Sequence, residues 1–230
     1  MFSKIAILID GEFFIKRHLA YFKKLYPNKS YNPTPQEMAK AIQTHCLKHI
    51  KKENNEELYR IFFYDCKPLN KKAHYPLSKK SIDFSKTQKY IFRNKLHECL
   101  VSIPRLALRF GYLDEHNATW TIKDENKLKQ VLSGDIFVSS LKDDDYKYHA
   151  KQKGVDIKIG LDIATLTLKK IVERIVLISG DSDFVPAAKL ARTEGVIFTL
   201  DPMGNPIKPD LKEHIDYLNT TLPNYKNYKA

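Results

Sequence analysis

Acidic residues stand directly after two apolar runs that are typical of buried parallel strands. Residues 5–9 run into Asp10, and residues 175–178 are followed after a short turn by Asp181 and Asp183. Parallel strands of an open α/β sheet end at a common edge, which is where such sheets bind ligands. Two strands that each bring an aspartate to this edge are more informative than either alone. Taken by itself, Asp10 also suits an ordinary turn or helix cap.

A third acidic position follows the glycine hinge at Gly154. Asp156 lies at the start of a helix that we expect to reach Val172, and Asp162 comes six residues later. If both were helical they would point about 240° apart and could not hold one ion. We favour Asp156 at the sheet edge, because the hinge can turn it there. Asp162 would then support the site from behind or project into solvent.

Carboxylates gathered at one edge indicate a hard divalent cation. They repel one another, which raises their pKa values unless a cation compensates. Oxygen ligands without His or Cys suit Mg²⁺ or Mn²⁺, and such ions can activate water for the hydrolysis of a phosphodiester. The eight histidines are scattered without a spacing pattern, so we expect each to be a surface or core residue rather than a catalyst.

The charge balance favours a polyanionic partner. The chain has 39 basic and 27 acidic residues, a formal net charge of +12, and nucleic acid is the commonest partner of such a protein. Residues 67–95 mix nine Lys or Arg with aromatic residues, which suits single-stranded nucleic acid but also a solvated loop anchored by its aromatics. The candidates for phosphate contact are Lys71, Lys72, Lys79, Lys80, Lys153 and Lys158.

The hydrophobic pattern predicts an α/β fold, a three-layer α-β-α sandwich around a mainly parallel sheet. The expected strands are 5–9, 58–64, 105–113, 175–178 and 196–200, and the expected helices are 12–25, 35–50, 86–100, 156–172, one that Gly195 closes, and 210–218. Residues 119–122 are expected to pair with 105–113 as an extra β-hairpin, with 146–151 as a third strand. Residues 143–145 are expected to form a solvated turn. We interpret 1–218 as one domain with a basic insertion at 67–150, and 219–230 as a polar tail.

The three cysteines are far apart and in no ligand-like spacing, so we expect reduced thiols. The N-terminus enters a strand too soon for a signal peptide, and no apolar run approaches the length of a membrane span. These features predict a cytoplasmic protein without a membrane partner, and they leave homo-oligomerisation open.

Three motifs together resemble a known family. Residues 9–12 (IDGE), residues 153–156 (KGVD) with Asp162, and residues 179–184 (SGDSDF) stand in the order and approximate spacing of the bacterial NYN domain family. They are most similar to its LabA-like (DUF88) branch of the PIN-like nuclease fold. The resemblance implies a metal-dependent endoribonuclease that acts on single-stranded or structured RNA. The residues that it implies for binding Mg²⁺ or Mn²⁺ and for catalysis are Asp10, Asp156, Asp181 and Asp183.

Two other functions stay open. Phe13 stands where the family usually has Asn, and this departure favours an NYN-type RNA-binding protein with weak or no catalysis. An aspartate-nucleophile phosphatase could use Asp10. That chemistry normally has a second Asp two residues later, where this chain has Glu12.

Overall fold

The structure, a computed structural model, describes residues 2–28 and 30–222. The chain divides into two compact units. Unit 1 comprises Met1–Cys66, Lys95–Gly111 and Gly154–Ala230, and unit 2 comprises Lys67–Asn94 and Tyr112–Lys153. The four candidate aspartates all belong to unit 1. Of the tail expected at 219–230, residues 223–230 lie outside the described part of the chain.

Unit 1 is built on a parallel sheet. Its strands, in their order across the sheet, are β5 (Leu106–Ile122, of which residues 106–111 belong to unit 1), β2 (Glu56–Cys66), β1 (Ser3–Asp10), β7 (Arg174–Ile178), β8 (Ile197–Asp201) and β9 (Tyr217–Leu218). Every neighbouring pair in this order is parallel. Residues 5–9 of β1 are 0% exposed, as expected for a central strand covered on both faces.

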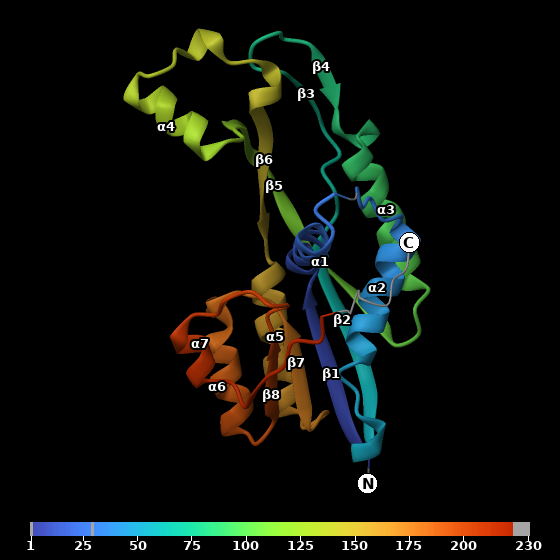
Figure 1. Ribbon diagram of the computed structural model, residues 1–230. Helices are drawn as coiled ribbons and strands as arrows, with labels where there is room; N and C mark the ends of the chain where they lie inside the picture. The colour runs from blue at the N-terminus through green and yellow to red at the C-terminus, as the bar shows by residue number, and fades with distance from the viewer. Residues whose placement is uncertain (1, 29, 223–230) are drawn as a thin grey trace. The chain divides into compact units, whose positions relative to one another are not determined.

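Helices cover both faces of this sheet. They are α1 (Gly11–Leu25), α2 (Pro35–Leu47), α3 (Gln88–Val101, which crosses from unit 2 into unit 1), α5 (Val155–Leu168), α6 (Val185–Thr193) and α7 (Pro209–Glu213). Figure 1 shows α2 on one side of β1 and β7, with α5, α6 and α7 on the other. The predicted three-layer α/β sandwich around a mainly parallel sheet is therefore confirmed.

Local signals explain where two of these helices begin. Thr34 caps α2, because its hydroxyl accepts the Glu37 N–H at 3.2 Å while the Glu37 carboxylate accepts the Thr34 N–H at 2.7 Å. Gly11 opens α1 against β2. A Cβ at Gly11 would lie 2.5 Å from the Phe63 ring and 2.7 Å from the backbone oxygen of Tyr64, so only glycine fits here.

Unit 2 contains two antiparallel ladders and a short helix. They are the hairpin β3 (Lys72–His74) with β4 (Ser81–Asp83), the outer part of β5 with β6 (Tyr146–Lys153), and α4 (Glu125–Ser133), which the sequence did not predict. The expected pairing of 119–122 with 105–113 is wrong, because both stretches belong to the single strand β5. β5 continues through an irregularity where Asp114 accepts the Asn117 N–H at 3.2 Å, and β6 is its partner.

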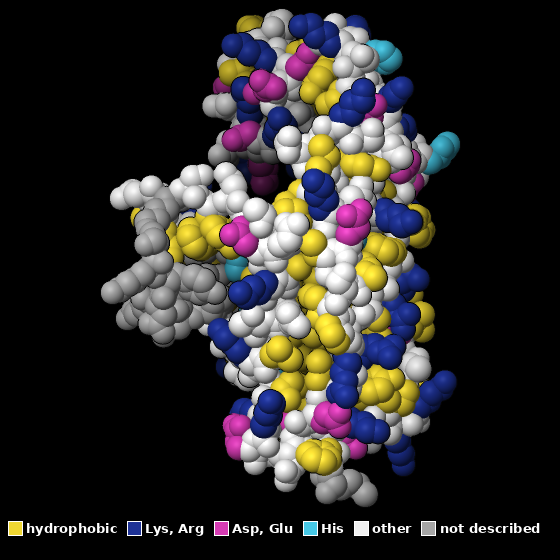
Figure 2. Space-filling model, turned by 90° about the vertical axis from the view of Figure 1, so that its right-hand side faces the viewer, with side chains coloured by type: hydrophobic (Ala, Val, Ile, Leu, Met, Phe, Trp, Pro, Cys, Tyr) yellow, Lys and Arg dark blue, Asp and Glu magenta, His cyan; other side chains and the backbone are white. Residues whose placement is uncertain are grey.

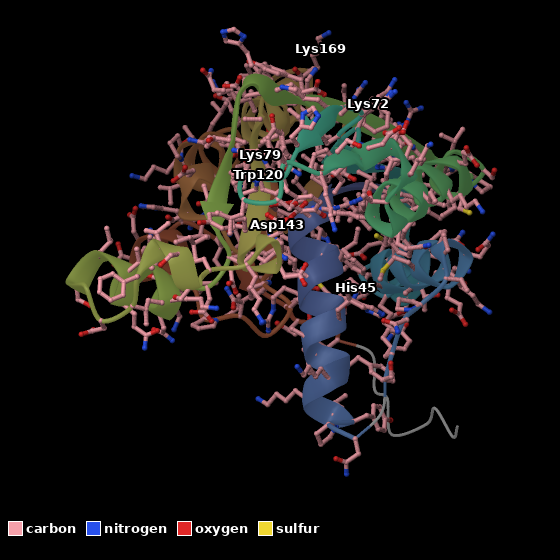
Figure 3. All side chains as sticks on the ribbon, turned by 90° about the horizontal axis from the view of Figure 1, so that it is seen from above. His45, Lys72, Lys79, Trp120, Asp143 and Lys169 are labelled. Carbon is pink, nitrogen blue, oxygen red and sulfur yellow. The ribbon has the colours of Figure 1, made fainter. Side chains whose placement is uncertain are left out.

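Half-buried aromatic side chains pack against one another in unit 2. Trp120 lies 5.2 Å from Tyr75, 6.3 Å from Phe84 and 5.3 Å from Tyr148, measured between ring centroids. Trp120 is labelled in Figure 3. Tyr75 and Phe84, two of the aromatics interspersed in the basic segment, thus anchor that segment to β5 and β6.

Two further expectations need correction. The helix expected at 210–218 ends at Glu213, and Tyr217–Leu218 instead joins β8 as β9, because the Asp216 carboxylate accepts the Phe198 N–H at 2.7 Å and holds the chain at the sheet. Residues 143–145 form a 3₁₀ helix rather than a purely solvated turn. The Asp143 carboxylate accepts the N–H groups of residues 77 and 78 at 3.2 and 3.3 Å and so organises the turn after β3.

Candidate active site

The carboxyl ends of β1 and β7 place two of the predicted aspartates. Ile9 pairs with Ile178, so Asp10, the last residue of β1, lies beside the point where β7 ends and the chain continues to Asp181. Asp10 caps α1 by accepting the Phe13 N–H at 3.0 Å. Asp181 caps a 3₁₀ helix (Ser182–Phe184) by accepting the Asp183 N–H at 3.0 Å. Each cap uses one of the two carboxylate oxygens, so capping and ligand binding are compatible.

Asp156 reaches the same part of unit 1 from α5. Gly154 adopts a φ of +79° immediately before the helix, a conformation that favours glycine, and Asp156 lies in the first helical turn. Asp156, Asp181 and Asp183 are exposed to solvent, whereas Asp10 is half-buried. The hinge expected from the sequence is therefore present.

Asp156 is coupled electrostatically to each of the other three aspartates. Burial raises the pKa of Asp10 to about 6, the Phe13 N–H opposes this rise, and repulsion from Asp156 adds to it. Burial also raises the pKa of Asp156, and repulsion from Asp181 and Asp183 adds to that rise. Burial and repulsion both disfavour the charged carboxylates, and a bound cation would offset both effects. The donor set, carboxylate oxygens alone, suits Mg²⁺ or Mn²⁺.

The acidic edge is open rather than compact. No three of the four aspartates are among the described groups whose ligand atoms all lie within 4.8 Å of one another. Mg²⁺ usually keeps several waters and binds through one or two carboxylates, so it does not require a tighter cage.

Asp162 has a structural role. It accepts the hydroxyl of Tyr64 at 2.7 Å and the Nε–H of Arg109 at 3.2 Å. Tyr64 belongs to β2 and Arg109 to β5, so Asp162 fixes α5 to two neighbouring strands. Asp156 is six residues earlier on the same helix, so this attachment also holds the helix end that carries it.

The loop after β8 adds polar groups that the sequence analysis missed. The ammonium group of Lys208 donates to the Ser182 hydroxyl at 3.0 Å, and Ser182 is the residue between Asp181 and Asp183 in the sequence. The amide nitrogen of Asn205 lies 3.2 Å from where a Cβ on Gly180 would be, and the Phe13 ring is nearer, at 2.6 Å. The sequence did offer one signal for these residues. Their loop follows the carboxyl end of a buried strand, as the segments that carry Asp10 and Asp181 do.

The lysines predicted to contact phosphate differ in their surroundings. Lys153 forms an ion pair with Asp114 at 2.7 Å, and its pKa is raised by that carboxylate. The ammonium group of Lys71 donates to the backbone oxygen of residue 115 at 3.0 Å, and that of Lys79 donates to the backbone oxygen of residue 76 at 2.7 Å. The side chains of the remaining three are exposed: Lys72, Lys80 and Lys158.

Basic side chains do not gather into one patch on the face shown in Figure 2. Lys and Arg are spread over this face, with acidic and apolar side chains between them.

Within residues 2–28 and 30–222, none of the helices has the length and apolar character needed to span a bilayer.

A comparison with known protein families agrees with the fold. The profile of the NYN domain matches residues 63–217, which is more than half of the chain and includes Asp156, Asp181 and Asp183 but not Asp10. NYN domains are part of the PIN-like nuclease superfamily. The chain belongs to the NYN domain family.

No curated protein matches the chain in sequence. A crystal structure of a protein of unknown function from Vibrio parahaemolyticus is similar, with 14% identity, a TM-score of 0.46, and coverage of 95% of this chain and 93% of that one.

Proposed function

We propose that this protein is a metal-dependent endoribonuclease that hydrolyses RNA phosphodiester bonds at the acidic edge of unit 1. The observation that carries the proposal is the placement of aspartates from three separate elements at one end of the sheet, with Asp156 close enough to repel Asp10, Asp181 and Asp183. Membership of a PIN-like nuclease family supports the same reading. The LabA-like branch and a cytoplasmic location belong to this proposal.

The side chains of the edge divide the work between them. Asp10, Asp156, Asp181 and Asp183 would hold Mg²⁺ or Mn²⁺. When bound, such an ion supplies an activated water and stabilises the leaving oxygen. Asp10 gains most from a cation, because burial and the neighbouring acids disfavour its charge. Lys208, beside Ser182, is placed to neutralise a phosphate oxygen of the substrate.

A second candidate is an RNA-binding protein with weak or no turnover. Phe13 favours it, because the aromatic ring stands where the family usually has Asn and lies against Gly180, at the turn that carries Asp181. An apolar ring there cannot help to orient water, metal or phosphate.

Cleavage of labelled RNA separates the two candidates. The wild type is incubated with mixed RNA and DNA oligonucleotides in Mg²⁺ or Mn²⁺, beside Asp10→Asn and Asp181→Asn. We expect internal cleavage of RNA by the wild type, reduced about 100-fold or more in both variants, as is typical when an essential group is removed.

Asp144→Asn is the matched control. It removes one exposed carboxylate from the 3₁₀ helix Asp143–Asp145 of unit 2 and should leave cleavage unchanged. RNA binding without metal-dependent cleavage would favour the second candidate. Cleavage that persists in Asp181→Asn would reject the proposed site.

A further inference from the structure

Three buried side chains of unit 1 form a cluster apart from the four aspartates. His45 lies in the last turn of α2, His49 follows just past the end of that helix, and Asp201 ends β8. Their ligand atoms all lie within 4.8 Å of one another, and no other described group of three or more His, Cys, Asp or Glu is so compact. Figure 3 labels His45 between α1 and α2.

The cluster has the size of a four-coordinate metal site. The Asp201 Oδ2 atom is 2.7 Å from His45 Nε2 and 3.0 Å from His49 Nε2. The Thr221 hydroxyl closes the fourth corner, 3.1 Å from His45 Nε2, 3.2 Å from His49 Nε2 and 3.2 Å from Oδ2. Around a tetrahedral zinc with bonds of about 2.0–2.1 Å, ligand atoms are about 3.3–3.4 Å apart. Most of these pairs need to separate by only a few tenths of an ångström.

Hydrogen bonding alone leaves this cluster crowded. A single oxygen, Asp201 Oδ2, faces two imidazole nitrogens and the Thr221 hydroxyl, whereas a carboxylate oxygen has about two lone-pair sites. The Nδ1 atoms of His45 and His49 are buried and have no hydrogen-bond partner among the described residues. In the metal-free chain each Nε2 therefore donates its proton to Asp201, and a bound cation would displace both protons. Each neutral ring can carry its proton on Nδ1 instead, where no described group competes for it.

The backbone around the cluster is held in place by a neighbouring cation. Arg174 donates to the backbone oxygen of His49 at 2.6 Å, so the chain just past the end of α2 is fixed beside Asp201. A ligand held in this way needs little rearrangement to bind a metal ion.

We propose that His45, His49 and Asp201 hold one structural Zn²⁺ ion, with the Thr221 hydroxyl at the fourth position. Two imidazoles with one carboxylate favour Zn²⁺ over Mg²⁺. The three side chains are 0–1% exposed, and structural zinc sites are closed in this way. The ion ties the end of α2, the end of β8 and the segment 219–222 together, so its role differs from that of a catalytic cation at the four aspartates.

The experiment is metal analysis of the full-length chain, carrying an affinity tag without histidine and purified in the presence of zinc. We expect about one zinc per chain in the wild type by mass spectrometry of the metal. Zinc content should fall close to zero in His49→Gln and in Asp201→Asn. Co²⁺ added to the metal-free wild type should give the visible absorption of a tetrahedral site, and zinc should raise its melting temperature.

Two controls locate the ion. His97→Gln disrupts a separate buried His–Asp contact of unit 1, where Asp65 is 2.7 Å from the ring nitrogen, and should keep its zinc. Asp181→Asn alters the acidic edge and should also keep it.

The wild-type measurements test the proposal even where a variant does not fold. The proposal is overturned if the wild type takes up no zinc, shows no tetrahedral Co²⁺ spectrum, and melts at the same temperature with and without chelator. It is also overturned if folded His49→Gln and Asp201→Asn retain zinc.

Discussion

At the scale of single residues, the Asp10 carboxylate has two opposing effects on the stability of the fold. Its carboxylate caps α1, which stabilises the fold, yet burial and neighbouring acids raise its pKa to about 6. A charge held in such surroundings costs folding free energy, and sites of this kind are typical of functional residues. Removing the charge should therefore reveal whether Asp10 is more than a cap.

We expect Asp10→Asn to stabilise the protein at pH 7.5 in buffer without Mg²⁺ or Mn²⁺. The pKa of Asp10 is raised from 3.8 to about 6 in the folded state, so folding favours the protonated form and stability falls as the pH rises between these values. The full difference corresponds to about 3 kcal/mol. The melting temperature of the variant should exceed that of the wild type at pH 7.5 and approach it at pH 4. Equal destabilisation at both pH values would indicate a helix cap only.

The position of acidic residues at the ends of strands could be predicted from the sequence, whereas contacts between residues far apart in the sequence could not. Asp10 and Asp181 follow apolar runs, so their place at the sheet edge was readable. His45 and Asp201 meet across 156 positions of sequence, and no local pattern announces such a contact. The contact of Lys208 with Ser182 could not be predicted for the same reason, because it depends on the path of a loop.

At the scale of elements, two short junctions position the acidic edge. Gly11 lets α1 begin against β2, and Asp162 fixes α5 to β2 and β5. The elements themselves were predictable from apolar periodicity and capping residues, as at Thr34. The strand at Tyr217–Leu218 could not be predicted. The Asp216 carboxylate accepts hydrogen bonds from β8 and α6, and these override the helical pattern of residues 210–218.

We expect Gly11→Ala to lower the free energy of unfolding by about 2 kcal/mol or more and to reduce RNA cleavage, because the new Cβ would collide with the Phe63 ring and with backbone. Gly160→Ala in the middle of α5 is the matched control. A Cβ there meets nothing within 4 Å, so this change should stabilise by about 0.5–1 kcal/mol. Urea unfolding measures both, and similar effects of the two variants would contradict the account of the α1 junction.

Asp162→Ala should lower the free energy of unfolding by about 1–3 kcal/mol, because it leaves the hydroxyl of buried Tyr64 without its acceptor. Tyr64→Phe removes the donor instead and should cost less. Urea denaturation of both variants tests this order. If Asp162→Ala matched the wild type, the attachment of α5 through this residue would be wrong.

At the scale of the whole molecule, the net charge of +12 attracts RNA in general but does not define a specific binding surface. Lysines expected to contact phosphate are in part engaged with the protein itself, as the ion pair of Lys153 with Asp114 shows. Lys72 and Lys80 are exposed and remain candidates for direct phosphate contact.

We expect the double variant Lys72→Ala/Lys80→Ala to weaken binding of single-stranded RNA and to flatten its salt dependence. Loss of two phosphate contacts should reduce the slope of log K against log salt by about 1.4. Fluorescence anisotropy in the Asp181→Asn background measures this without cleavage. Lys23→Ala/Lys24→Ala, in the last turn of α1, removes the same charge and should change the slope less. Equal slopes for the two double variants would argue against specific contacts at Lys72 and Lys80.

The most direct test of the account is anomalous X-ray diffraction from crystals soaked in Mn²⁺. The account predicts an anomalous peak in contact with Asp10 and with at least one of Asp156, Asp181 and Asp183, and no such peak in crystals of Asp181→Asn. Ordered aspartates with no manganese between them, in crystals of a protein that cleaves RNA, would contradict it.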